Sequence, residues 1–153
     1  MKYFALIAIF LIGSILVACG DEEVSKAERE QARTVELNAQ VAKLAEPTVH
    51  PPSKPTKKIV VKDLKEGTGP PAEKGDDMTM EYLGVDLAGK ELYSSWDDDE
   101  LHTSTLGWGS YFPGWDKAVK GMKVGGRREI FFPASETLRH GPLFYVVDLI
   151  AIE

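Results

Sequence analysis

The chain of 153 residues carries 18 basic and 24 acidic side chains, for a formal net charge of −6, and 43% of its residues are hydrophobic. This balance is typical of a globular protein of one domain, not of a disordered chain. The acidic charge disfavours a nucleic-acid binder, because phosphates are neutralised by a basic face. A single cysteine excludes a disulfide framework and a multi-cysteine metal site, and the three histidines share no metal-ligand spacing. We expect no metal and no cofactor.

The first segment is predicted to be an export signal over residues 1–18. An apolar run follows Lys2 and ends at Ala18; it is shorter than the ~20 residues of a transmembrane helix and fits a signal-peptide core. Its end, Leu16-Val17-Ala18-Cys19-Gly20, resembles the bacterial lipobox. In lipobox precursors the cysteine thiol receives a diacylglyceryl group and becomes the mature N-terminus. We therefore expect lipidation of Cys19, which would anchor the protein to the membrane of the bacterial cell envelope, facing outward from the cytoplasm. The alternative is a plain cysteine beside an uncleaved anchor.

Residues 19–57 are predicted to be a polar, partly helical and proline-rich tether. The part from residue 21 to residue 57 has neither aromatic residues nor glycine, and residues 24–45 are rich in helix formers. Pro47 ends any helix there, and three further prolines favour an extended continuation. The thin apolar stripe favours a solvated tether that lifts the following domain off the membrane. A short dimerising coiled coil is the alternative.

Residues 58–153 carry the signals of a folded domain. Eleven of the 14 aromatic residues lie from Tyr82 onward. Strands are predicted over 59–64, 78–83, 91–95, 102–106, 128–132 and 143–152. One short helix fits, over residues 115–120, because Pro113 favours its first turn and Gly121 ends it. The sequence therefore predicts an α+β domain in which a bent antiparallel β-sheet is wrapped around one short helix.

The motifs of this domain resemble those of FKBP-type peptidyl-prolyl cis-trans isomerases, in the same order and over residues 59–153. They are Gly75-Asp76-Asp77, Tyr82-Leu83-Gly84, Gly89-Lys90, Ser94-Ser95, Leu106-Gly107, Pro113-Gly114-Trp115-Asp116, the stretch from Gly121 to Arg128, and Val146-Val147-Asp148-Leu149. The resemblance implies an FKBP-like fold and isomerisation of X–Pro bonds without a cofactor. It also implies proline-containing polypeptides as substrates and macrolides such as rapamycin as ligands.

The resemblance also assigns a pocket. It implies that Trp115 forms the floor beneath the prolyl ring, and that Tyr111 and Phe112 form the adjoining wall. The backbone N–H of Phe112 is the expected donor to the substrate. Tyr82 and Tyr145 match aromatic positions on two strands that line the cleft.

Several positions depart from the family pattern. Leu92 and His102 stand at or next to positions usually taken by phenylalanine, and both are expected to line the pocket. Tyr93 replaces an aspartate, and the loop of residues 134–142 is short. His140 stands where a tyrosine usually donates to the substrate carbonyl, and an imidazole N–H can also donate. The predicted catalytic set is thus Tyr82, Tyr93, Tyr111, Phe112, Trp115, His140 and Tyr145.

Three functions compete at this point. The leading one is a lipid-anchored isomerase that helps exported proteins to fold. The replacement at Tyr93 and the short loop keep open a peptide-binding or holdase module with weak or no isomerase activity. A purely structural lipoprotein is disfavoured, because a scaffold has no need of the aromatic cluster.

Overall fold

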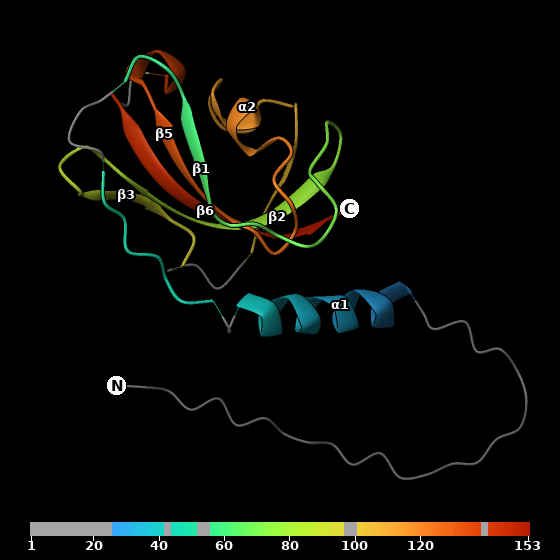
Figure 1. Ribbon diagram of the computed structural model, residues 1–153. Helices are drawn as coiled ribbons and strands as arrows, with labels where there is room; N and C mark the ends of the chain where they lie inside the picture. The colour runs from blue at the N-terminus through green and yellow to red at the C-terminus, as the bar shows by residue number, and fades with distance from the viewer. Residues whose placement is uncertain (1–25, 42–43, 52–55, 97–100, 139–140) are drawn as a thin grey trace, which may run out of the picture.

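The computed structural model describes residues 26–41, 44–51, 56–96, 101–138 and 141–153 (Figure 1). Six strands form one antiparallel sheet in the order β1-β5-β6-β2-β3, and β4 pairs with β2 beyond the end of β3. The strands are β1 Val60–Lys65, β2 Asp77–Val85, β3 Glu91–Ser94, β4 His102–Thr105, β5 Arg127–Phe132 and β6 Leu143–Ile152. Each matches a predicted strand, and the predicted α+β class with a bent antiparallel sheet is confirmed.

The central strands β2 and β6 are buried along almost their whole length. A sheet with one solvated face would bury only every second residue. Near-continuous burial therefore means that both faces of this sheet are covered. The concave face holds the main core with α2, and the convex face is covered by the segment that precedes β1.

The short helix α2, Trp115–Val119, packs into the concave face and buries Trp115, Ala118 and Val119 against it. A buried arginine ties its end to the sheet. The Arg128 side chain from β5 donates to the Ala118 carbonyl at 2.8 Å and pairs with Asp63 of β1 at 2.6 Å. This guanidinium satisfies a carbonyl at the helix end, where no intrahelical donor is available. The helix predicted over residues 115–120 is confirmed to within one residue.

Residues 44–51, which we call the N-terminal strap, lie against the convex face. Pro47 is buried, and Val49 packs on a cluster of four apolar residues of β2, β5 and β6: Val85, Phe131, Phe144 and Val146. Arg127 pairs with Asp148 and also donates from Nη2 to the Ala45 carbonyl at 2.8 Å. The tether predicted for residues 19–57 is therefore not free over its whole length, and contacts with the folded sheet begin before residue 58.

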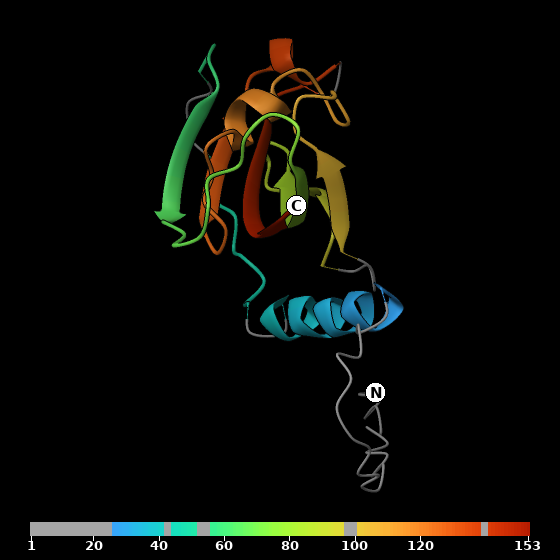
Figure 2. The same cartoon turned by 90° about the vertical axis from the view of Figure 1, so that its right-hand side faces the viewer.

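Helix α1, Lys26–Val41, forms where helix-forming residues predicted helical structure. Figures 1 and 2 show it on the side of the sheet away from α2. An ion pair joins Arg33 to Glu153 at the end of the chain, and Leu37 is half-buried against the sheet. Val35 remains 68% exposed. Among the described residues, no helix has the length and apolar character needed to cross a membrane.

Candidate active site

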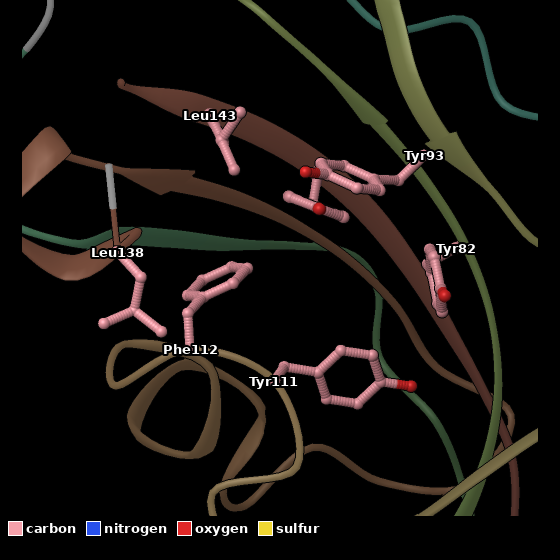
Figure 3. Close-up of a pocket in the computed structure, with 7 residues that line it drawn as sticks. Tyr82, Tyr93, Tyr111, Phe112, Leu138 and Leu143 are labelled. Atoms are coloured by element: carbon pink, nitrogen blue, oxygen red, sulfur yellow. The ribbon is translucent and has the colours of Figure 1, made fainter. Parts of the chain in front are cut away.

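A cavity of about 190 Å³ opens on the concave face, between the sheet and the segment that leads into α2 (Figure 3). Seven residues line it, all aromatic or aliphatic: Tyr82, Tyr93, Tyr111, Phe112, Leu138, Leu143 and Tyr145. None carries a charge at neutral pH. The cavity is therefore suited to an apolar ring, with phenolic hydroxyls as its polar side-chain groups.

Three adjacent strands supply the tyrosines of the sheet side. Tyr82 comes from β2, Tyr93 from β3 and Tyr145 from β6. The Tyr93 and Tyr145 rings are stacked, with centroids 6.3 Å apart and planes at 14°. The centroid of the Tyr82 ring lies 6.1 Å from that of Tyr145. Because β2 is hydrogen-bonded to β3 on one side and to β6 on the other, this wall is fixed by the sheet register and not by a loop.

The segment before α2 supplies the opposite wall. The Tyr111 ring packs edge-on against the Tyr82 ring, with centroids 6.0 Å apart. The Tyr111 side chain also forms hydrogen bonds with Ser104 and Tyr82. The Phe112 ring packs edge-on against the Phe132 ring, with centroids 4.7 Å apart. The Phe112 carbonyl also accepts the Trp115 N–H at 2.9 Å, which closes the turn that begins the helix. The helix start thus sets the position of both wall residues.

Two of the pocket phenols, Tyr111 and Tyr145, have raised pKa values. Burial raises the pKa of Tyr111 above its ordinary value, and its hydrogen bonds to Ser104 and Tyr82 offset part of that shift. Burial also raises the pKa of Tyr145, and nearby Tyr93, Tyr82 and Tyr111 add to the shift. A phenol with a raised pKa remains a neutral hydrogen-bond donor at and above physiological pH. The chemistry available in this pocket is hydrogen bonding and apolar contact.

The sequence comparisons match this architecture. Residues 69–140 match the family model described as FKBP-type peptidyl-prolyl cis-trans isomerase. An FK506-binding protein of Streptomyces anulatus is 36% identical over 116 residues, which cover 67% of this chain and 92% of the relative. The chain belongs to the FKBP-type peptidyl-prolyl cis-trans isomerase family. Family membership makes it a peptidyl-prolyl cis-trans isomerase, as the motifs predicted.

Further relatives and solved structures agree. An FK506-binding protein of Neisseria meningitidis serogroup B is 40% identical over 76 residues, covering 50% of this chain and 70% of the relative. The crystal structure of FkpA from Escherichia coli superposes with a TM-score of 0.58 at 20% identity, covering 86% of this chain and 74% of that one. The crystal structure of AtFKBP13 superposes with a TM-score of 0.57 at 23% identity, and the match covers 62% of this chain and 93% of that one. These two structures show that the fold is shared.

Trp115 lies beneath the pocket of this isomerase and is not among the residues that line it. It is 1% exposed, and the Tyr111 ring packs on it with centroids 4.5 Å apart and planes at 32°. The rings of Tyr145 and Phe132 also pack against the indole, with centroids 5.4 and 6.1 Å from its own. The predicted pocket floor is thus covered. In this structure the indole packs against the wall residues, and the Tyr111 ring is the nearest of them.

The other predicted residues divide into three groups. Tyr82, Tyr93, Tyr111, Phe112 and Tyr145 come together around the cavity. His102 lies beside it, with its ring 5.1 Å from that of Tyr82. Leu92 is 38% exposed, stands at a register shift of β3 against β2, and is not among the residues that line the cavity. His140 and Cys19 lie outside the described residues.

Two lining residues were not predicted, Leu143 and Leu138. Leu143 stands two positions before Tyr145 on β6, so strand alternation starting from Tyr145, which the family resemblance had assigned to the cleft, could have found it. Leu138 lies in the loop before β6, where no periodic pattern signals which way a side chain points. Its position follows from the loop conformation alone.

Proposed function

We propose that this protein is a lipid-anchored isomerase that acts on X–Pro bonds of exported proteins at the surface of a bacterial membrane. The observation that carries the isomerase part is the uncharged cavity of five aromatic and two leucine side chains. The lipobox-like residues around Cys19 support the membrane location. Together they support the proposal of a folding helper held in the cell envelope.

The cavity suits the physical demands of prolyl isomerisation. Rotation about the amide faces a barrier of ~20 kcal/mol, because the bond loses resonance as it twists. The twisted amide has a less polar carbonyl than the planar one. An apolar, water-poor pocket therefore disfavours the planar ground state relative to the twisted transition state. No nucleophile or metal is required for this step.

The phenols have a positioning role in this proposal. Tyr82 and Tyr111 place hydroxyls at one edge of the cavity, and the neutral state of Tyr111 keeps its proton available for a carbonyl that flanks the proline. Phe112, Leu143 and Tyr145 supply apolar contact for the prolyl ring. Binding of the flanking carbonyls would hold the chain while the amide rotates.

A second function is favoured by one specific observation. The indole of Trp115 is 1% exposed and is not among the lining residues, so a prolyl ring in the cavity meets smaller rings instead of the indole. Together with Tyr93 in place of the usual aspartate, this supports a peptide-binding or holdase module with weak isomerase activity. Both functions use the same cavity and differ in the rate of rotation.

A protease-free isomerisation assay with Ala-X-Pro-Phe peptides and the purified mature protein separates them. The isomerase proposal predicts catalysed exchange that rapamycin suppresses and that Phe112→Ala reduces at least tenfold. Val35→Ala, an exposed site on α1, should match the parent protein. Peptide binding without catalysed exchange would favour the holdase function. Absence of both would contradict the proposal.

The membrane location has its own test. Because Cys19 is the only cysteine, Cys19→Ala should abolish incorporation of labelled fatty acid and release the protein from the membrane fraction. A conservative control is Ser14→Ala, which changes the preceding segment without removing the thiol. Label retained on the alanine variant at position 19 would contradict lipidation.

A further inference from the structure

Ser104 is a polar residue on the core face of β4. The strand pairs with β2 so that Ser104 lies opposite Met78, and His102 lies opposite Met80. Both methionines are buried in the main core, and cross-strand partners share one face of a sheet. Ser104 therefore faces the concave side and is half-buried, whereas Thr103 beside it is exposed. A hydroxyl in such a place costs free energy unless it forms a hydrogen bond.

The partner of Ser104 is the phenol of Tyr111. The Tyr111 side chain forms hydrogen bonds with Ser104 and with Tyr82 of β2. A phenol has one proton to donate, so the Tyr111 oxygen accepts at least one of these two bonds. Burial raises the pKa of Tyr111, and both hydrogen bonds lower it. A group that donates to the oxygen stabilises the phenolate and has this effect. Ser104 and Tyr82 are therefore the donors, and the Tyr111 oxygen is their acceptor.

The Tyr111 ring is held in place by its neighbours. It packs edge-on against the Tyr82 ring, and its centroid lies 4.5 Å from that of the buried Trp115 ring. The freedom that remains is the direction of the O–H bond, which the hydrogen-bond partners control. With two donors on the oxygen, the Tyr111 proton is left for a group outside this cluster. Figure 3 shows the Tyr82 and Tyr111 hydroxyls at the end of the pocket away from Leu138.

We propose that Ser104 is a positioning residue, which donates to the Tyr111 oxygen and so leaves the Tyr111 proton to bind a backbone carbonyl next to the rotating amide. The inference rests on the proposed isomerase function, in which such a carbonyl is held while the amide rotates. A hydroxyl that accepts a hydrogen bond also becomes a stronger donor, because linked hydrogen bonds polarise one another. Ser104 itself is not among the residues that line the cavity, so it acts through Tyr111.

The test is protease-free isomerisation of Ala-Ala-Pro-Phe by the purified mature protein. The held carbonyl does not belong to the bond that rotates, so its hydrogen bond has the same strength in the ground state and the transition state and affects KM instead of kcat. Ser104→Ala should raise KM about fivefold, the scale of one hydrogen bond, and leave kcat close to the parent value. Ser104→Thr keeps the hydroxyl and should restore the KM of the parent.

The matched control is Thr103→Ala, which removes a hydroxyl from the exposed face of the same strand and should leave KM unchanged. A double variant tests the partner. In Tyr111→Phe, Ser104 has no phenol to which it can donate, so Ser104→Ala should cause no further rise in KM there. NMR of isotope-labelled tyrosine tests the contact without substrate. The signal of the Tyr111 ring carbon that bears the hydroxyl should shift in Ser104→Ala and return in Ser104→Thr.

Three results would overturn the inference. One is a Ser104→Ala protein with the KM and the Tyr111 signal of the parent. Another is an equal rise in KM on Ser104→Ala in the parent and in Tyr111→Phe. The third is a fall in kcat that Ser104→Thr does not restore, which would make Ser104 a packing residue. A parent protein that catalyses no exchange would instead contradict the proposed function, while the Tyr111 signal would still show whether Ser104 binds the phenol.

Discussion

Tyr93 and Tyr145 stack on each other from strands that are not neighbours, because the residue between them is Gly84. Gly84 of β2 is paired with Tyr93 on β3 and with Tyr145 on β6. A Cβ at Gly84 would lie 2.5 Å from two atoms of the Tyr145 ring. The ring therefore lies directly over the glycine backbone, and this close approach forms part of the pocket wall.

Gly84→Ala should displace the Tyr145 ring and disturb the pocket. We expect a loss of unfolding free energy of ~1–3 kcal/mol, the usual cost of overpacking, together with lower kcat/KM. Urea unfolding and the isomerase assay measure the two effects. Tyr145→Leu removes the ring that the alanine would clash with. Gly84→Ala should therefore lower the unfolding free energy less in the Tyr145→Leu background than in the parent protein. Strictly additive costs would contradict the close approach.

Trp115→Phe should leave the pocket lining in place, since the indole lies beneath it. We expect a folded, less stable variant whose kcat/KM stays within a few-fold of the parent value. Trp115→Ala should cost ~3–5 kcal/mol of stability, as for other large buried aromatics. A well-folded phenylalanine variant that has lost its activity would place the indole in contact with the substrate, as a pocket floor requires.

The N-terminal strap should stabilise the domain measurably. The fragment 58–153 contains the aromatic core and should unfold cooperatively, but its convex apolar cluster is left uncovered. The fragment 44–153 should be more stable by about 2 kcal/mol, the scale of burying one valine-sized side chain. Thermal and urea unfolding of the two fragments check this.

Val49→Ser in the longer fragment should remove most of that gain, because Val49 contacts the cluster. Thr48→Ser, at the exposed neighbouring position, is the matched control and should behave as the parent fragment. Equal stability of the two fragments would show that the strap contacts contribute nothing.

Stability should fall as the pH rises above 10. Burial raises the pKa of Tyr111 and Tyr145 above 10.0 in the folded state, so above that pH the unfolded chain loses these protons first. The folded state then binds more protons than the unfolded state, and the unfolding free energy decreases with pH. Below pH 10 both states are protonated and these two groups contribute no slope. Urea unfolding at pH 9 and pH 11 measures the change.

Lysines also titrate in this range, so the readout is the difference between the parent and Tyr145→Phe. The phenylalanine variant lacks one of the raised groups and should lose less stability between the two pH values. A pH dependence identical to that of the parent would show that Tyr145 ionises as easily in the folded chain as in the unfolded one.

Local patterns in the sequence were sufficient for the secondary structure and the family. The family resemblance put Tyr82 and Tyr145 at the cleft, and proline and glycine at the ends of a short apolar run placed α2. Both features depend on residues a few positions apart, which a sequence displays directly. The motifs around Trp115 and Gly121 indicated the family for the same reason.

Only the tertiary structure determined which distant segments contact each other and which side chains line the pocket. The Tyr145 ring packs edge-on against Trp115 because β6 and the start of α2 meet in space, and the hydrogen bond from Arg127 to the Ala45 carbonyl spans 82 positions of the chain. Leu138 lines the cavity from the loop before β6, with a left-handed backbone that no local sequence pattern signals. Amino-acid type and spacing determined which elements form, because those preferences are local. Packing between distant segments determined which side chains reach the pocket, because it depends on shapes that no single segment contains.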